Sequence, residues 1–231
     1  MTVMAIWIKI CGNTKLEDAR TAVEAGADAL GFIFAPSPRR ISPRDAARIT
    51  SSLPADVEKI GVFVNQSADL ILDTIHKAAL TGVQLHGDED VAFARDLRNR
   101  SVKGLRIIKT VSLSNGSIDG SVAMETGAAE VFDTLLLDSG STAQRGGTGK
   151  RFDWKSAAPL LRLAARKFRI VVAGGLTSST VAEAIRTLDP WGVDVVSGVE
   201  REPGKKDPAK VREFIGAVKE AELHATGQKK N

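Results

Sequence analysis

The sequence predicts an α/β protein that folds as a single (β/α)8 barrel around a parallel eight-stranded sheet. Eight apolar runs alternate with eight helical segments along the whole chain. The apolar runs are continuous, as in strands that are covered on both faces of a parallel sheet. The chain has 231 residues, close to the about 250 that one such barrel takes. No break in composition marks a linker, so we expect one domain over residues 1–231.

The expected strands are short apolar runs bounded by glycine, proline or polar residues. They cover residues 6–10, 29–34, 59–64, 82–86, 104–110, 131–138, 169–174 and 193–197. The expected helices cover 16–25, a segment from 43 onward, 68–79, 88–98, 117–126, 153–167, 178–188 and 207–223. Ser42 is expected to cap the second helix, with Pro43 at its first position. We expect residues 225–231 to form a disordered tail.

An open doubly wound sheet is the alternative fold for the same alternation of strands and helices. Such sheets often bind a dinucleotide through closely spaced glycines after the first strand. Gly12 follows the first apolar run, but no further glycines stand at the required spacing. The sequence therefore favours the barrel.

The composition excludes several classes of protein. Cys11 is the only cysteine, which rules out an internal disulfide framework and a cysteine-based zinc site and suits a reducing compartment. Three dispersed histidines without an i, i+4 pair give no metal signature. Lys9 interrupts the first apolar run, so this run does not read as a signal peptide, and no stretch is suited to cross a membrane. We expect a cytoplasmic protein that binds no metal.

The charge pattern argues against a nucleic-acid partner. The net charge of +4 comes from interspersed basic and acidic residues, and tyrosine is absent. A stacking surface for single-stranded nucleic acid is therefore not expected. The mild positive balance favours a small anion as ligand.

Two proton-transfer candidates stand at the ends of predicted strands, where the active site of a (β/α)8 barrel lies. Cys11 ends the first strand, and Asp138 ends the very apolar run 135–137 of the sixth. Partial burial would raise the pKa of Asp138 and suit it to act as a general acid. The alternatives are a buried structural cysteine and a locally paired carboxylate. Lys9 shares a strand face with Cys11, where it either favours the thiolate or pairs with a carboxylate such as Asp194.

Other polar residues follow the second and fourth strands. Gln84 and His86 share one strand face, and His86 reads more readily as a hydrogen-bonded structural residue than as a catalyst. Arg39 and Arg40 are surface charges by default, but one of them could clamp a substrate carboxylate.

Glycine-rich turns follow the last three predicted strands and indicate a phosphate site. The residues are Gly147, Thr148 and Gly149 after the sixth strand, Gly174 and Gly175 after the seventh, and Ser197 and Gly198 after the eighth. The alternative is that these glycines only permit tight turns. A nucleotide P-loop is excluded, because Arg151 follows Lys150 where serine or threonine is required.

These motifs together resemble the phosphoribosylanthranilate isomerase family over nearly the whole chain. They are K-I-C-G at 9–12, G-A-D-A-L-G-F at 26–32, S-P-R-R-I-S at 37–42, G-V-F-V-N at 61–65, Q-L-H-G at 84–87, L-L-L-D at 135–138, G-G-T-G-K-R-F-D-W at 146–154, A-G-G-L at 173–176, V-D-V-V-S-G-V-E at 193–200 and P-G-K-K-D at 203–207. Two departures stand outside the proposed catalytic groups: Ala173 replaces a frequent serine, and Arg40 replaces a frequent aromatic residue.

The resemblance implies an Amadori rearrangement in tryptophan biosynthesis that needs no cofactor. N-(5-phosphoribosyl)anthranilate becomes 1-(2-carboxyphenylamino)-1-deoxyribulose 5-phosphate. By motif position, Cys11 is the general base, Asp138 the general acid and Arg39 the ligand of the anthranilate carboxylate. Gln84, His86 and Asp194 are expected to contact the phosphosugar substrate. The protein is expected to be a monomer or a homodimer.

Two other classes stay open. One is another phosphosugar enzyme on the same barrel, such as the aminoimidazole-carboxamide ribonucleotide isomerase of histidine synthesis or indole-glycerol-phosphate synthase. The other is a regulatory barrel that binds phosphate without catalysis. Cysteine at the first strand argues against the first of these enzymes, which generally uses two aspartates.

Overall fold

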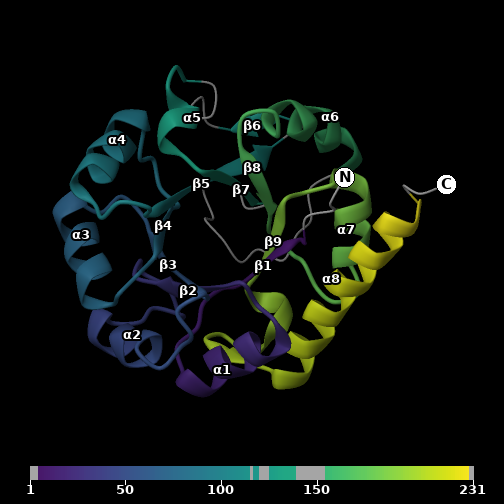
Figure 1. Ribbon diagram of the computed structural model, residues 1–231, viewed down its shortest axis with the longest axis horizontal. Coiled ribbons are helices and arrows are strands. Elements are labelled where there is room, and N and C mark those ends of the chain that lie inside the picture. Colours follow the sequence, from purple (N-terminus) through teal and green to yellow (C-terminus); the bar gives the residue numbers. More distant parts are fainter. Residues whose placement is uncertain (1–4, 115–116, 120–124, 139–153, 229–231) are drawn as a thin grey trace.

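The computed structural model of the chain describes residues 5–114, 117–119, 125–138 and 154–228, and shows a closed parallel barrel ringed by helices (Figure 1). The barrel strands are β1 Trp7–Ile10, β2 Ala29–Ile33, β3 Glu58–Phe63, β4 Gly82–Leu85, β5 Arg106–Ser114, β7 Thr134–Asp138, β8 Arg169–Val172 and β9 Gly192–Val195. Pairing runs β4-β3-β2-β1-β9-β8-β7-β5, and a β4–β5 pairing closes the ring. The predicted barrel is confirmed, and the open sheet is excluded.

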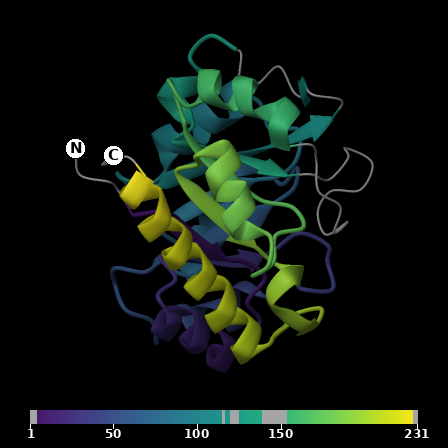
Figure 2. The same cartoon turned by 90° about the vertical axis from the view of Figure 1, so that its right-hand side faces the viewer.

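The helices connect successive strands around the outside. They are α1 Leu16–Ala25, α2 Pro43–Thr50, α3 Ala68–Lys77, α4 Val91–Arg100, α5 Ala128–Val131, α6 Trp154–Ala164, α7 Val181–Leu188 and α8 Pro208–Gln228. Ser42 caps α2 as predicted, because its hydroxyl accepts a hydrogen bond from the Asp45 N–H at 3.1 Å. The long α8 packs against α1 and α7 (Figure 2).

The predicted helix over 117–126 is wrong. Strand β5 continues to Ser114, and β6, Ser117–Asp119, pairs with it in antiparallel register. The helix of this unit is α5, which begins later at Ala128 and has four residues. Since α5 ends at Val131, the sixth barrel strand begins at Thr134 rather than at 131. The missed signal was the Asn-Gly pair at 115–116, which is typical of a hairpin turn.

The end of the chain also differs from the prediction. Helix α8 runs to Gln228, about one turn beyond the predicted end at 223. The tail predicted for 225–231 was therefore assigned too early, because its first four residues are helical; residues 229–231 lie outside the described residues. Among the described helices, none combines the length and apolarity that crossing a membrane requires.

The buried residues form two layers separated by the barrel wall. The larger apolar cluster lies between the strands and the surrounding helices. A smaller apolar cluster lies inside the barrel and comprises Trp7, Ala29, Ile60, Ile108, Leu136, Val171 and Ala173. The barrel interior also contains a polar layer, in which Lys9, Gln84 and Asp194 are all buried. Polar groups buried in this way require partners, and this polar layer forms the floor of the site described below.

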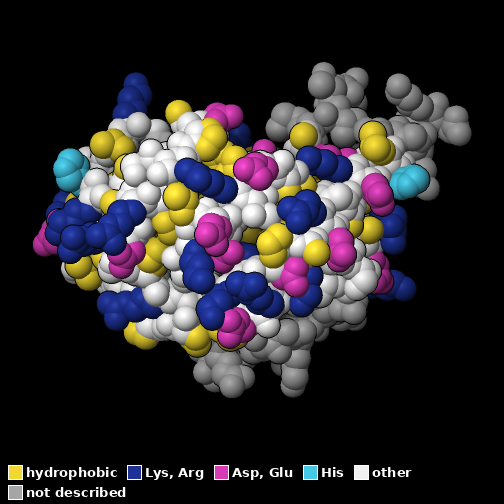
Figure 3. Space-filling view, turned by 90° about the horizontal axis from the view of Figure 1, so that it is seen from below, with side chains coloured by type: hydrophobic (Ala, Val, Ile, Leu, Met, Phe, Trp, Pro, Cys, Tyr) yellow, Lys and Arg dark blue, Asp and Glu magenta, His cyan; other side chains and the backbone are white. Residues whose placement is uncertain are grey.

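The surface view agrees with a mixed charge pattern. Figure 3 shows Lys and Arg side chains interspersed with Asp and Glu on the face that it presents. A small two-stranded sheet, β10 Glu200–Glu202 and β11 Lys205–Lys206, follows the 3₁₀ turn Ser197–Val199 after β9. It lies beside the carboxyl ends of the barrel strands, since its Lys206 contacts Cys11 and Val196.

Candidate active site

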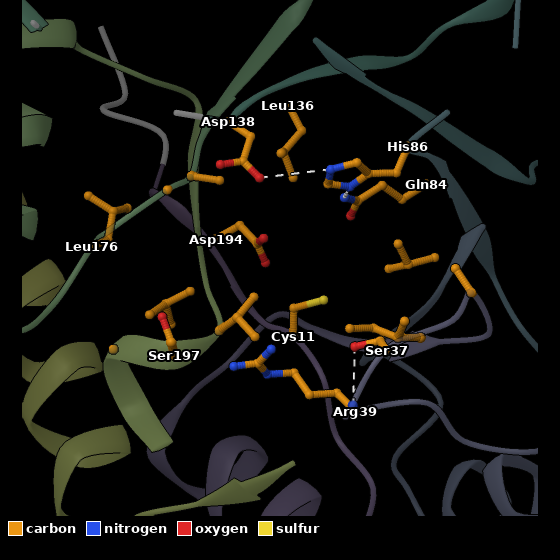
Figure 4. Close-up of a pocket in the computed structure, with 18 of the residues that line it drawn as sticks. Cys11, Ser37, Arg39, Gln84, His86, Leu136, Asp138, Leu176, Asp194 and Ser197 are labelled. Carbon is orange, nitrogen blue, oxygen red and sulfur yellow. Dashed lines mark hydrogen bonds and ion pairs between the residues drawn. The ribbon is translucent and has the colours of Figure 1, made fainter. Parts of the chain in front are cut away.

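A cavity of about 250 Å³ opens at the carboxyl ends of the barrel strands (Figure 4). Its lining includes six of the predicted catalytic and substrate-binding residues, together with four residues of the predicted phosphate site. The residues brought together are Cys11, Arg39, Gln84, His86, Asp138, Gly174, Gly175, Asp194, Ser197 and Gly198. Gly147, Thr148 and Gly149 lie outside the described residues.

Cys11 follows β1, and its position is fixed by its neighbours on both sides. Its backbone N–H donates to the Val195 carbonyl oxygen at 2.9 Å. A Cβ atom at Gly31 on β2 would overlap the Cys11 sulfur, so the thiol occupies the space that glycine leaves open. Burial raises the pKa of the thiol, although the Lys9 ammonium acts to lower it. Burial is the larger of the two effects, so the thiol form is favoured.

Lys9 lies fully buried beneath Cys11 and pairs with Asp194. The two residues are register partners on β1 and β9, and Lys9 Nζ lies 2.8 Å from Asp194 Oδ1. Lys9 Nζ also donates to Gln84 Oε1 at 2.9 Å. Burial acts to lower the pKa of Lys9, but the interactions with Asp194 and Cys11 raise it by more. The pKa is therefore raised overall, and Lys9 stays cationic. The predicted pairing of Lys9 with Asp194 is confirmed. The Lys9 charge also acts to lower the pKa of the Cys11 thiol, but burial raises that pKa by more.

His86 is neutral and hydrogen-bonded, as its position on the strand suggested. Gln84 Nε2 lies 3.1 Å from His86 Nδ1, and an amide nitrogen can only donate, so Nδ1 accepts. The ring proton then lies on Nε2, which is 3.8 Å from Asp138 Oδ2. Burial, with the Lys9 charge as a second cause, lowers the pKa of His86 to about 4. His86 thus directs an N–H group, not a cation, toward Asp138.

Asp138 ends β7 and is almost buried, with 8% of its surface exposed. In the sheet order, β9 and β8 lie between β1 and β7, so Cys11 and Asp138 reach the cavity from well-separated strands. Figure 4 shows both side chains at the same cavity, with Asp138 on one side and Cys11 on the other. This places an acid and a thiol on opposite sides of one space.

Arg39 lines the cavity, whereas Arg40 is exposed. The Glu200 carboxylate holds the Arg39 guanidinium: Nε lies 2.9 and 3.0 Å from the two carboxylate oxygens, and Nη2 lies 2.8 Å from Oε2. Burial acts to raise the pKa of Glu200, but the hydrogen bonds from Arg39 and the charge of Lys206 lower it overall. Glu200 is therefore a carboxylate.

Glycines following β8 and β9 give the cavity its remaining wall. Gly174 and Gly175 adopt φ values of +80° and +66°, which favour glycine over other residues. A Cβ atom at Gly198 would overlap the Leu176 carbonyl oxygen. These positions therefore need glycine for the turns themselves, and they also bring backbone to the cavity wall. The geometry is compatible with both interpretations of the glycines, a phosphate site and tight turns.

Sequence reasoning missed Glu200 and Lys206. Both stand in quoted motifs, but a Lys-Lys pair ordinarily indicates an exposed surface. Lys205 does pair with Glu202 at the surface, whereas Lys206 is 1% exposed and donates to Cys11 O, Val196 O and Glu200 Oε1. The signal that could have found it is the short hairpin, in which neighbouring side chains point to opposite faces.

The site fits no metal centre within the described part of the chain, because no group of three histidine, cysteine or acidic side chains there could hold a metal ion. The barrel and its cavity are typical of an enzyme active site: a carboxyl group, a thiol, an arginine and glycine turns surround one space at the carboxyl ends of the strands.

Comparison with known proteins identifies the family. The family model "N-(5'phosphoribosyl)anthranilate (PRA) isomerase" matches residues 8–217. The N-(5'-phosphoribosyl)anthranilate isomerase of Pelobacter propionicus is 46% identical over 222 residues, which cover 96% of this chain and 99% of that protein. The corresponding Bacillus cereus strain Q1 enzyme is 44% identical over 213 residues, covering 92% and 98%. The chain therefore belongs to the N-(5'-phosphoribosyl)anthranilate isomerase family.

Solved structures agree with this assignment. The phosphoribosyl anthranilate isomerase of Thermotoga maritima superposes with a TM-score of 0.80 at 41% identity, covering 93% of this chain and 99% of that one. Another isomerase structure, a complex with reduced 1-(o-carboxyphenylamino)-1-deoxyribulose 5-phosphate, gives a TM-score of 0.77 at 40% identity, with the same coverage. The protein is an aldose–ketose isomerase of tryptophan biosynthesis, as the sequence motifs predicted.

Proposed function

We propose that Cys11 and Asp138 carry out the two proton transfers of the Amadori rearrangement. The observation that carries this assignment is their position at one cavity, on strands separated by two others. Asp138 donates a proton to the ring oxygen of the aminated furanose, which opens the ring to a Schiff base. Cys11 as thiolate then removes the C2′ proton, and the enolamine tautomerises to the ketone.

The raised pKa of Cys11 does not conflict with this role. The Schiff base formed in the first step is cationic, and a cation beside the sulfur favours the thiolate. Lys9 already acts in that direction. The thiolate is therefore favoured at the stage of the reaction that uses it, whereas burial favours the less reactive thiol before the Schiff base forms.

The remaining site residues are proposed to bind substrate. Arg39 takes the anthranilate carboxylate, since charge-assisted hydrogen bonds to a guanidinium suit that group. Gly174, Gly175, Ser197 and Gly198 take the phosphate together with Gly147, Thr148 and Gly149. Gln84, His86 and Asp194 face the sugar from the floor of the cavity. A relative binds the reduced product named above, which carries both a carboxylate and a phosphate.

Turnover of two variants tests the catalytic roles. Cys11→Ala and Asp138→Asn should each reduce kcat by about 10²–10⁴-fold, the usual contribution of a proton-transfer group. The fluorescence decay of phosphoribosylanthranilate measures turnover, and titration with the reduced product measures binding, which should be largely kept. Arg40→Ala is the matched control, because Arg40 is exposed and outside the cavity lining. Full activity in either catalytic variant refutes the assignment.

Substrate choice, assembly and location follow as further proposals. Aminoimidazole-carboxamide ribonucleotide isomerase and indole-glycerol-phosphate synthase activities should be absent when the purified protein is assayed with each substrate. The phosphoribosylanthranilate isomerase of Thermotoga maritima is dimeric, and a crystal structure of monomers generated from it is known. We propose a monomer or homodimer for this chain, which light scattering distinguishes, and a cytoplasmic location, which fractionation tests.

A further inference from the structure

Three charged side chains form a row at the wall of the cavity: Arg39, which lines the cavity, and the buried Glu200 and Lys206, called here the charge row. We propose that the charge row sets the carboxylate selectivity of the site, with Glu200 orienting Arg39 and Lys206 supplying the charge that keeps the row cationic. The inference rests on the proposed role of Arg39 as the ligand of the substrate carboxylate. Glu200 and Lys206 are positioning residues in this account, since neither lines the cavity.

Glu200 fixes the plane of the Arg39 guanidinium. It receives hydrogen bonds from Nε and from Nη2, so both of its oxygens are engaged on one edge of the guanidinium. Within the described residues, Nη1 has no hydrogen-bond partner. Figure 4 shows the guanidinium beside Cys11 and Ser197 at the edge of the cavity. The opposite edge of the guanidinium is therefore held ready for an anionic ligand group.

This orientation has an electrostatic cost. The Glu200 side chain is 4% exposed, and a buried carboxylate against Arg39 cancels most of the attraction that the arginine exerts on a second carboxylate. An arginine paired in this way would be well placed but would select weakly for an anion. The charge row needs a second cation if it is to bind an anionic group of the substrate.

Lys206 is that cation: burial lowers its pKa, the Glu200 charge opposes this shift, and its hydrogen bonds are those of an ammonium group. Its Nζ lies 2.5 Å from Cys11 O, 3.3 Å from Val196 O and 3.2 Å from Glu200 Oε1. Three acceptors use all three protons of an ammonium group, whereas a neutral amine has only two protons to donate. Two cations and one anion leave the row with one net positive charge at the cavity.

A charge-balance cycle separates this role from simple structural support. Lys206 also ties the ends of β1 and β9 together, so loss of activity in a single variant is ambiguous. We therefore compare two substrates: phosphoribosylanthranilate and phosphoribosylaniline, which lacks the carboxylate. The readout is the ratio of their kcat/KM values, because damage to the barrel affects both substrates alike.

Lys206→Met should lower this ratio by about tenfold or more, since it leaves Arg39 and Glu200 neutral as a pair. The double variant Lys206→Met/Glu200→Gln restores one net positive charge and should recover most of the lost ratio. Lys205→Met is the matched control: it removes the adjacent lysine, which pairs with Glu202 at the surface, and should leave the ratio unchanged. Thermal melts of each variant report folding separately.

The outcomes are distinct. If the ratio is unchanged in Lys206→Met, or falls further in the double variant, the charge-row proposal is wrong. Arg39→Ala tests the assignment beneath it: a lower ratio in Arg39→Ala with an unchanged ratio in Lys206→Met overturns the charge row alone. An unchanged ratio in Arg39→Ala overturns the role of Arg39 as the carboxylate ligand. If Lys206→Met does not fold, the same comparison is made with Lys206→Gln, which also removes the positive charge; a ratio equal to that of the wild type refutes the proposal.

Discussion

Gly31→Ala should reduce activity strongly, although Gly31 carries no chemical group. A Cβ atom at this position would lie 2.9 Å from Cys11 Cβ and 3.0 Å from Cys11 Cα, and would overlap the sulfur. Rotation of the thiol relieves only part of this crowding, because Cys11 Cα and Cβ are also too close. Packing extra atoms into a filled core costs about 1–3 kcal/mol of the free energy of unfolding.

The effect on turnover should exceed the effect on stability. Displacing a reacting group by about 1 Å costs roughly 10²-fold in rate, so kcat of Gly31→Ala should fall by about that factor. Gly216→Ala on α8 is the control, since a Cβ atom there meets nothing within 4 Å. It should keep full activity and gain up to about 1 kcal/mol of stability from better helix propensity.

Stopped-flow fluorescence gives kcat, and urea unfolding gives the stability of both variants. Wild-type kcat in a folded Gly31→Ala protein would refute the reasoning, because the thiol would then tolerate displacement. Equal losses in Gly31→Ala and Gly216→Ala would show a general effect of adding a methyl group.

Three further predictions follow from the buried charges. Burial lowers the pKa of His86 to about 4, so between pH 6.5 and about 4 His86 binds a proton in the unfolded chain but not in the folded protein. The free energy of unfolding should therefore fall by up to about 3 kcal/mol as the pH drops through this window. In unfolding titrations, His86→Gln should remove that slope. Lys9→Met leaves Asp194 buried without its cation and should destabilise the fold by about 3–5 kcal/mol by urea unfolding, unless Asp194→Asn is added. Because burial raises the pKa of the Cys11 thiol, kcat/KM should increase with pH above about pH 7, and a flat profile there would contradict a thiolate base.

The barrel could be predicted from the sequence because each unit carries its own local signal. Continuous apolar runs mark strands covered on both faces, and capping residues such as Ser42 mark helix starts. The segment after β5 was misassigned because its polar residues fit both a weak helix and a hairpin. Pairing of β6 with β5 is a contact between chain segments, and helical periodicity alone does not decide it.

The site was predictable where position in the barrel decides it. Cys11 and Asp138 stand at strand ends, and all strand ends of a parallel barrel meet at one face. The charge row was not predictable in this way. Burial of Lys206, but not of Lys205, depends on how a two-stranded turn packs against β1 and β9. A hairpin pattern indicates that two adjacent lysines point to opposite faces, but which of the two is buried is decided only in the packed structure.

The balance of forces on Cys11 also escaped sequence reasoning. The spacing of Lys9 and Cys11 placed an ammonium near the thiol and favoured the thiolate. The structure adds burial, which is the larger effect and has the opposite sign, whereas the pairing of Lys9 with Asp194 was the alternative that the sequence already offered. Magnitudes of this kind depend on desolvation, which a sequence does not specify.

The division of roles between Cys11 and Asp138 is tested most directly by isotope effects with substrate deuterated at C2′. Loss of the base should make C–H cleavage more strongly rate-limiting, so Cys11→Ser should show a larger isotope effect on kcat than the wild type. Loss of the acid should make ring opening rate-limiting, so Asp138→Asn should show an isotope effect close to one. A larger effect in Asp138→Asn than in Cys11→Ser would contradict the assignment.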